Sequence, residues 1–437
     1  MKKTSILLAF TCILITSNGL CSELISSAPT SVSMYSQSRN NNTLKPFTRN
    51  INLGLKPEKT SPKDNFFGIA IPRTKLTGEQ NSRTGYSVSA SGDYVVFGAP
   101  EDDVNGNFSG SAHAYKYENE VGWVSEKHFI PSDGDAGDEF GNSIAMSGDH
   151  MIVGAYHDEG NYGYESGSAY IYRRNGSGGW DFVSKPFASD GEIGDEFGTA
   201  VAMSGDHAIV GAPAKDGWNG AVYVFKKDAS GNWNEETKIV TGNVNCAAFG
   251  NSISISEDYI AAGTTGGTEM VFIYKRNGTS WTLHSQITDL WNSYTYLRCS
   301  ISGDYMVVGT PFGMNGGNTD GAAYVYKRNG TEWIRQVKFL PNSGDHQFGR
   351  VVSIFDDYVA VGSGEISIFA RHGENWSEVT RQAGDLSGTF FGSAVSVSAK
   401  HFVAGDFLDW SNGPYSGAVY IYDIISKFKK KEEPSTY

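Results

Sequence analysis

The sequence is poor in cysteine, and its charge is predominantly negative. Only 4 of the 437 residues are cysteine, and 35 Lys and Arg stand against 48 Asp and Glu, which gives a formal net charge of -13. A small disulfide scaffold uses cysteine far more densely. Binding of nucleic acid needs clustered Lys and Arg. The composition therefore excludes a disulfide-built mini-domain and argues against a nucleic acid as partner.

Long apolar runs are also missing beyond the N-terminus. Lys2 and Lys3, an apolar stretch over 6–15 and small residues at 17–19 form the pattern of a secretory signal peptide over residues 1–19. The apolar stretch is too short to span a bilayer, and no later stretch is long enough. We expect an extracytoplasmic protein without a transmembrane segment, which is secreted, periplasmic or held at the cell surface.

A lipid anchor would have to be attached at Cys21. Asn18 and Leu20 are unfavourable at the two positions where such a site needs an apolar and a small residue. The sequence therefore favours a cleaved signal peptide over a lipoprotein.

Aromatic residues and glycine are abundant, and they recur in a fixed order. With 53 Gly, 23 Tyr and 24 Phe, the composition favours many short strands and tight turns. The stretch 197–225 contains Phe-Gly, an alternating segment, a Ser-Gly-Asp turn, an apolar run ending in Gly-Ala-Pro, and an aromatic strand. Versions of it recur at intervals of roughly fifty residues. The copies begin at Thr84, Phe140, Phe197, Phe249, Thr295, Phe348 and Phe391.

Each of the first six copies contains four strand-like segments, and the fourth begins with a tryptophan. Four antiparallel strands per repeat predict an all-β, seven-bladed β-propeller over residues 65–424. The seventh copy lacks the tryptophan strand, whereas one strand over 65–76 precedes the first copy. We expect this N-terminal strand to close the last blade, because closure leaves no open edge. Residues 20–64 are expected to be a disordered linker and residues 425–437 a basic flexible tail.

The copies resemble FG-GAP repeats, the blades of the integrin α-subunit β-propeller and of many exported bacterial proteins. The resemblance rests on Phe-Gly together with Gly-Ala or Gly-Ala-Pro, as in 140–155 and 197–213. It implies a propeller with a role in binding or adhesion. Integrin blades hold calcium between the first and second strands, but here a tight Ser-Gly-Asp turn takes that place and leaves no room for a chain of ligands.

Strand order sorts the loops onto two faces. Turns between the first and second and between the third and fourth strands lie on a short-turn face. Loops between the second and third strands, and the crossings between blades, lie on a long-loop face. Loops carry function more often than scaffolds do, and exposed aromatic residues are good anchors. The candidate binding residues on this face are Asp102, Asp103, Tyr156, His157, Asp158, Tyr162, Tyr164, Trp218, Phe312, Trp410 and Tyr415.

Two acidic crossings admit a second interpretation. Their carboxylates are near the spacing that a loop for a hard cation uses, although no ligand pattern frames them. We therefore expect no cofactor, and calcium bound by these crossings is the alternative. The carboxylates concerned are Asp133, Asp135, Asp138, Asp190, Glu192 and Asp195.

The body of the chain contains two cysteines, Cys246 and Cys299. In an oxidising compartment they could form a disulfide. Two buried free thiols are the alternative.

Catalytic motifs are missing. No GxSxG elbow, P-loop, HExxH or dinucleotide fingerprint occurs. His150, His207 and His401 take the place of a strand-opening tyrosine in other copies, which predicts a structural role, and the remaining histidines show no partner at ligand spacing. We expect a monomeric protein that is not an enzyme and binds a protein ligand. A carbohydrate-binding propeller is the alternative, and a hydrolase acting in the central channel is a second one.

Overall fold

The computed structural model describes residues 33–37, 44–48, 68–69, 74–242, 246–266, 270–290, 296–312, 320–342, 347–385 and 390–425. The chain divides into two units, Met1–Phe66 and Phe67–Tyr437. In the first unit, β1 (Ser33–Gln37) and β2 (Leu44–Thr48) pair antiparallel, within the stretch expected to be a linker. The expected signal peptide and nearly all of the expected tail lie outside the described residues.

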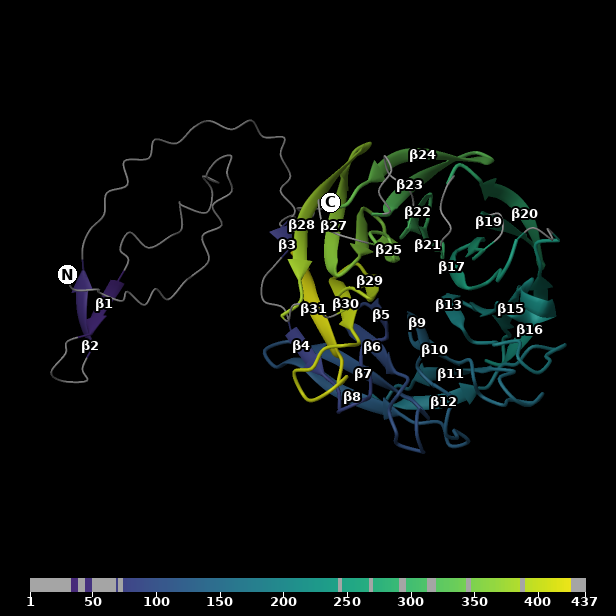
Figure 1. Ribbon diagram of the computed structural model, residues 1–437, viewed down its shortest axis with the longest axis horizontal. Helices are drawn as coiled ribbons and strands as arrows, with labels where there is room; N and C mark the ends of the chain where they lie inside the picture. The colour runs from purple at the N-terminus through teal and green to yellow at the C-terminus, as the bar shows by residue number, and fades with distance from the viewer. Residues whose placement is uncertain are drawn as a thin grey trace, which may run out of the picture. The chain divides into compact units, whose positions relative to one another are not determined.

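The second unit is a ring of seven antiparallel sheets, which confirms the predicted β-propeller (Figure 1). The strands of each blade follow one another from the axis outward. Consecutive innermost strands contact each other, and β29 contacts β5, so the ring is closed. The strands of blades 1 to 4 are β5 (Ser87–Ser91), β6 (Tyr94–Ala99), β7 (Ser111–Glu118), β8 (Gly122–Phe129), β9 (Ser143–Ser147), β10 (His150–Ala155), β11 (Ser168–Arg174), β12 (Trp180–Ser184), β13 (Ala200–Ser204), β14 (His207–Ala212), β15 (Ala221–Lys227), β16 (Trp233–Ile239), β17 (Ser252–Ser256), β18 (Tyr259–Gly263), β19 (Val271–Asn277) and β20 (Ser280–Ile287). The strands of blades 5 to 7 are β21 (Arg298–Ser302), β22 (Tyr305–Thr310), β23 (Ala322–Asn329), β24 (Glu332–Phe339), β25 (Val351–Phe355), β26 (Tyr358–Gly362), β27 (Glu365–His372), β28 (Asn375–Ala383), β29 (Ala394–Val397), β30 (His401–Asp406) and β31 (Ala418–Ile425).

The N-terminal strand closes blade 7, as the repeat pattern predicts. It is divided into two segments, β3 (Gly68–Ile69) and β4 (Thr74–Thr77), and both pair antiparallel with β31. The last blade therefore joins the two ends of the propeller.

Seven hydrophobic clusters, one between each pair of neighbouring blades, form the core of the described residues. The second strands are buried nearly throughout, as in β10 and β14, because both of their faces are covered. The Phe-Gly phenylalanines, such as Phe140 and Phe197, lie in these clusters and are about fully buried. The recurring motif is therefore the packing unit of the ring.

Glycine is required where neighbouring blades meet. A Cβ atom on Gly98 would lie 1.9 Å from the carbonyl oxygen of Gly141 in blade 2, and one on Gly405 would lie 1.8 Å from that of Gly85. Such contacts are impossible for any other residue. The same close approach at the seam between blades 7 and 1 shows that closure reproduces the internal seams.

Serine hydroxyls join the innermost strands across the seams. At five seams a serine Oγ accepts a backbone N–H from the next blade, at 3.0–3.2 Å. Blades 2 and 3 have Ala145 and Ala202 at this position. There Ser147 and Ser204, two residues further along, accept the N–H groups of Gly205 and Glu257 at 3.1 and 3.2 Å. The five bonds run from Met146 to Ser89, Ile301 to Ser254, Ile354 to Ser300, Val397 to Ser353, and Ala90 to Ser396.

The Ser-Gly-Asp turns are tight, and internal contacts occupy their aspartates. In blade 5, Gly303 has a φ of 54°. The Asp304 carbonyl accepts the Arg328 N–H at 2.8 Å, and the Asp304 carboxylate pairs with the Arg328 guanidinium. In this blade, the turn at which integrin blades hold calcium is therefore bound to the third strand through Arg328.

The seam between blades 4 and 5 differs from the other seams. Thr295, the expected start of the fifth copy, lies outside the described residues. At this seam Leu297 takes part in the close contact with Gly263, whereas elsewhere a glycine does so. Leu297 is fully buried and belongs to the hydrophobic cluster between blades 4 and 5.

Candidate functional site

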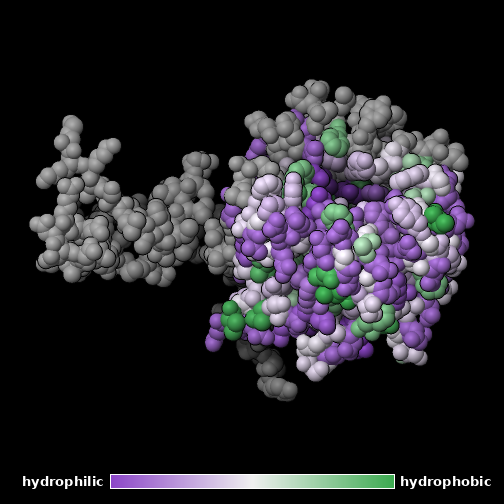
Figure 2. Space-filling model, turned by 60° about the horizontal axis from the view of Figure 1, so that its bottom comes forward, coloured by the Kyte–Doolittle hydropathy of each residue, from purple (hydrophilic) through white to green (hydrophobic). Residues whose placement is uncertain are grey.

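Exposed hydrophobic side chains gather on the long-loop face. Of the 19 large hydrophobic residues that are exposed among the described residues, 15 lie in loops between second and third strands or in crossings between blades. Val121 is the one in a short turn, and the other three lie on fourth strands. On the side seen in Figure 2, hydrophobic residues stand in small separate groups on a mostly hydrophilic surface. The long-loop face therefore carries most of the apolar surface available for contact.

Five of the predicted binding residues are exposed aromatics. The exposed fractions of these residues are 65%, 56%, 38%, 54% and 42% for Tyr164, Trp218, Phe312, Trp410 and Tyr415. The rings of Trp410 and Tyr415 lie 5.3 Å apart at 67°. The others come from different blades, so the residues form a dispersed set and not one pocket.

Three exposed aromatics share one structural position. Phe108, Trp218 and Tyr415 follow the second strands of blades 1, 3 and 7, and their φ angles are 58°, 71° and 50°. Each backbone carbonyl accepts an N–H from the next crossing, from Glu139, Ala248 and Arg83.

Blade 2 has Glu165, with a φ of 53°, at this position, and Glu165 accepts the N–H of Glu196. A bulky residue in left-handed backbone is unusual and persists only where its surroundings hold it. The sequence analysis did not name Phe108 as a binding residue, because the neighbouring blade sets the conformation of its loop.

Four other predicted binding residues make internal contacts. Asp103 accepts the Phe108 N–H at 2.9 Å and so shapes its own loop. His157 Nδ1 lies 3.4 Å from Glu139 Oε1, and this interaction raises the pKa of His157. The Tyr156 ring packs against His157, with centroids 3.8 Å apart, and Tyr162 donates a long hydrogen bond, 3.4 Å, to the Ser189 carbonyl.

Asp158 is buried, contrary to the expectation of an exposed binding residue. Tyr170 Oη donates to Asp158 Oδ2 at 2.6 Å, and Lys185 Nζ lies 2.8 Å from the same oxygen. Blade 7 repeats this arrangement with Asp409, Tyr420 and Lys75, at 3.0 and 2.8 Å. We call it the Asp-Tyr-Lys clamp. It joins the start of a long loop to the third and fourth strands, so its role is structural.

At the position of the clamp aspartate, blade 3 has a lysine, Lys215. This residue begins the short helix α1 (Lys215–Trp218). The Lys215 side chain is 2% exposed, its Nζ lies 3.1 Å from Asp195 Oδ2, and it donates to the Asp190 carbonyl at 2.6 Å. Burial would lower the pKa of Lys215, but the bond to Asp195 outweighs it and raises the pKa. Tyr223 and Lys238 bind the Asp190 carboxylate, at 2.7 and 2.8 Å.

The acidic crossings do not bring their carboxylates together around an ion. Asp138 is buried and accepts the Asp135 N–H at 2.7 Å, while Asp133 pairs with Lys185 at 2.8 Å. In the other crossing, Asp195 accepts the Glu192 N–H at 2.7 Å in addition to its bond with Lys215. Asp133, Asp138 and Asp195 thus make contacts within the protein that order the crossings.

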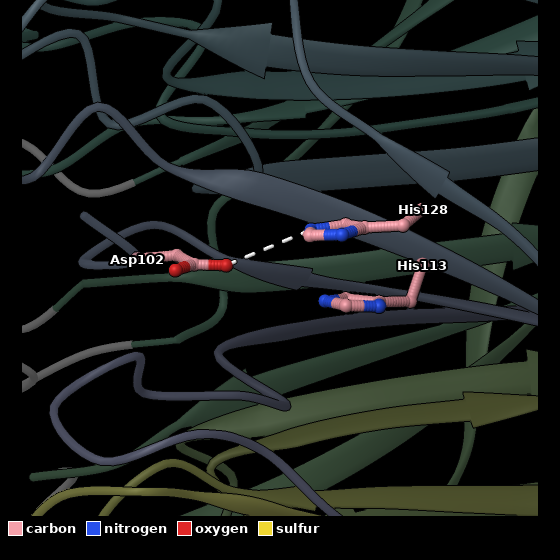
Figure 3. Close-up of side chains that lie close together, drawn as sticks. All are labelled: Asp102, His113 and His128. Atoms are coloured by element: carbon pink, nitrogen blue, oxygen red, sulfur yellow. Dashed lines mark ion pairs between the residues drawn. The ribbon is translucent and has the colours of Figure 1, made fainter. Parts of the chain in front are cut away.

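Blade 1 alone has histidines in place of the tyrosine and lysine of the clamp. His113 in β7 pairs in register with His128 in β8, and Figure 3 shows both rings beside the Asp102 carboxylate. The rings are parallel within 10°, with centroids 4.3 Å apart. His128 Nε2 lies 3.6 Å from Asp102 Oδ2, which Ser111 Oγ also reaches at 2.6 Å. One potential ligand atom from each of Asp102, His113 and His128 lies within 4.8 Å of the others.

The surroundings shift the acid–base properties of this cluster. Burial lowers the pKa of His113 to about 4, and the neighbouring His128 adds to this effect. Burial alone would raise the pKa of Asp102, but its contacts with His128 and Ser111 hold it below the ordinary value. At neutral pH, the cluster therefore contains a carboxylate and a neutral His113 imidazole.

This cluster corrects the sequence analysis, which expected these histidines to have no partner. Fifteen positions separate His113 from His128, and a bulge between Ala114 and Tyr115 shifts the register of the hairpin. The spacing alone therefore does not reveal the pair. Comparison with the Tyr-Lys pairs of other repeats is the signal that could have found it.

His150, His207 and His401 lie where the repeat pattern puts them. Their rings pack against Trp233, Trp281 and Trp123 of the next blade, at 5.7, 5.8 and 4.9 Å. Tyr94 and Trp180 make the same contact. The structural role predicted for these histidines is confirmed.

The disulfide between Cys246 and Cys299 does not form in the structure. Both residues are buried and free of disulfides. Cys246 lies in the cluster between blades 3 and 4, whereas Cys299 lies in the cluster between blades 4 and 5. Burial raises the pKa of Cys299 to about 11. The two thiols belong to different seams, which explains why they do not pair.

A family model described as FG-GAP repeat matches residues 77–115, 123–172 and 180–225. No curated protein matches the sequence. Among solved structures, the crystal structure of Saccharomyces cerevisiae Sqt1 aligns with 9% identity and a TM-score of 0.46, over 81% of this chain and 99% of that one. No helix among the described residues has the length and apolar character that a membrane crossing requires.

Proposed function

Because the chain carries FG-GAP repeats and folds as a seven-bladed propeller, we propose that it is an exported, non-catalytic scaffold that binds another protein through its long-loop face. FG-GAP propellers generally serve in protein interaction. Export is supported by the basic and apolar pattern over residues 1–19.

The observation that carries the proposal is the shared position of Phe108, Trp218 and Tyr415. Each is exposed, and each has left-handed backbone that asparagine or glycine would adopt with less strain. Folding alone therefore favours a smaller residue at these positions. Large exposed aromatics are the side chains that contribute most at protein interfaces. Their presence on three blades supports a surface maintained for contact.

The distribution of exposed apolar residues supports the same face. One of the 19 lies in a short turn, whereas 15 lie on the long-loop face. The long-loop face therefore offers more apolar surface to a partner than the short-turn face does.

The test is a triple variant, Phe108→Asn, Trp218→Asn and Tyr415→Asn. Asparagine tolerates the left-handed backbone, so the variant should retain or gain stability while losing the aromatic rings. The wild type and the variant are used to capture cell-envelope proteins, and captured proteins are quantified by mass spectrometry. We expect a specific partner to be depleted at least about tenfold, since hot-spot side chains contribute over 1 kcal/mol each.

Glu165→Asn is the matched control. It changes the same repeat position in blade 2 and relieves the same backbone strain, but it removes no aromatic ring. Capture by this control should equal that by the wild type. Equal capture by the triple variant and the wild type would refute the proposal.

A carbohydrate ligand is the second candidate, favoured by one observation. Trp410 and Tyr415 are exposed neighbours in one loop, with ring centroids 5.3 Å apart, and aromatic faces are suited to stacking on sugar rings. Binding to a glycan array that Trp410→Ala abolishes, with no protein partner captured, would favour this candidate.

A further inference from the structure

The starting point is a substitution within the repeat. Blades 2 and 7 surround a buried aspartate with a tyrosine hydroxyl and a lysine ammonium. Blade 1 retains the buried aspartate, Asp102, but its two partners are His113 and His128. The lysine charge that balances the carboxylate in the other blades is replaced by an imidazole ring, which is a metal ligand in its neutral form.

The three side chains offer a mixed oxygen and nitrogen donor set. Carboxylate oxygen and imidazole nitrogen are ligands for zinc and neighbouring first-row divalent ions, whereas calcium and magnesium prefer oxygen alone. Their potential ligand atoms lie within 4.8 Å of one another. In a tetrahedral site with bonds of about 2.1 Å, ligand atoms are about 3.4 Å apart. Coordination therefore requires the donors to move closer and the two imidazole rings, which are parallel within 10°, to tilt toward a common point.

The three ligands differ in freedom. The Asp102 side chain is 11% exposed and is held by Ser111 Oγ at 2.6 Å, while the His128 side chain is 40% exposed. The His113 ring stacks against the rings of Phe97 and His128, with centroids 5.2 and 4.3 Å away. Packing and hydrogen bonding thus hold Asp102 and His113 in place, and His128 on the outer strand has space to close on an ion.

We propose that Asp102, His113 and His128 form a binding site for a divalent transition-metal ion of the zinc type, with Ser111 as the positioning residue of Asp102. Three protein ligands leave a fourth coordination position for water or a ligand from outside. The ion joins the third and fourth strands of blade 1 to the start of the loop that carries Phe108. Binding of the ion therefore stabilises this long loop, and this effect does not depend on which partner the protein binds.

The experiment measures Zn²⁺ binding to the full chain by titration calorimetry, after treatment with a chelator and its removal. We expect one saturable site per chain, and substitution of Co²⁺ for Zn²⁺ should give visible absorption bands of a four-coordinate ion. Ca²⁺ and Mg²⁺ should give no heat of binding at this site.

The decisive variant is His113→Tyr with His128→Lys. It rebuilds the Asp-Tyr-Lys clamp that the same chain uses in blades 2 and 7, so we expect it to fold as the wild type does and to lose zinc binding. His128→Lys alone changes only the exposed ligand and should also abolish tight binding. His372→Gln, which removes an exposed histidine from the end of β27, is the matched control and should bind zinc as the wild type does.

Ser111→Ala tests the positioning role. Loss of a partner that orients a metal ligand lowers affinity by about 10- to 100-fold, so binding should weaken while its stoichiometry stays at one. Absence of saturable zinc binding in the wild type, or equal binding by the His113→Tyr/His128→Lys variant, would overturn the proposal.

Discussion

Serine hydroxyls at the inner seams provide a test of how the ring is held closed. Ser396 Oγ accepts the Ala90 N–H at 3.1 Å between blades 7 and 1. Alanine stands at the same repeat position in blade 2, as Ala145, so the seam tolerates a methyl group there. Replacing Ser396 by alanine therefore removes one hydrogen bond and creates no steric conflict.

We expect Ser396→Ala to lower the free energy of unfolding by about 1 kcal/mol, within the range of about 0.5–1.5 kcal/mol for one net hydrogen bond. The reverse change, Ala145→Ser, places an acceptor opposite the N–H of Met203, which corresponds to Met146 of the preceding blade. It should raise the free energy of unfolding by about 0.5–1 kcal/mol.

Equilibrium urea denaturation measures both changes, with Ser177→Ala in an exposed turn as control. Hydrogen exchange gives a local readout, because loss of about 1 kcal/mol accelerates exchange of the Ala90 amide about fivefold if opening is confined to the seam. A stable Ser396→Ala protein together with a destabilised Ala145→Ser protein would refute the role of the seam serines.

Three further predictions concern the crossings and the closure. Lys215→Met should destabilise the protein by about 3–5 kcal/mol in urea denaturation, because it leaves buried Asp195 without its cation. The control is Lys227→Met, which breaks an ion pair with the exposed Asp206. It should change stability by less than about 1 kcal/mol. Burial raises the pKa of Asp138 to about 6; the native state then holds a proton that the unfolded state releases, so this residue's contribution to stability falls as pH rises from about 4 to about 6. Asp138→Asn should remove this fall and raise stability at pH 7 by about 1–3 kcal/mol, and an unchanged pH profile of the melting temperature would contradict the assignment. A chain that begins at residue 80 lacks β4 and exposes the edge of β31, so size-exclusion chromatography should show association, and a monodisperse monomer of wild-type stability would contradict the closure.

The repeated part of the fold could be predicted from the sequence because each feature has a direct physical cause. Phe140 and Phe197 fill the clusters between blades, and Gly98 meets a backbone carbonyl that leaves no room for Cβ. The closing strand followed from counting strands in the last copy. The residue pattern was thus sufficient wherever packing within one repeat unit determines the structure.

The site could be predicted only in part, since neighbouring blades and strand register determine it. Asp102 and Asp158 were expected on the surface. Both are buried against the hairpin of the third and fourth strands, where Ser111 and Tyr170 donate hydrogen bonds to them. His113 and His128 meet only through a register that a bulge shifts. The exposed aromatics Trp218 and Trp410 were predicted correctly, because long polar loops seldom bury a tryptophan.

The central claim is that the long-loop face is the binding surface. Hydroxyl-radical footprinting of the protein alone and in complex with its captured partner tests it most directly. Protection of Phe108, Trp218 and Tyr415, with Phe182 on a fourth strand unchanged as an internal reference, is the result that we expect. Protection of Phe182 and of the short-turn residue Val121, with the three aromatics unchanged, would contradict the claim.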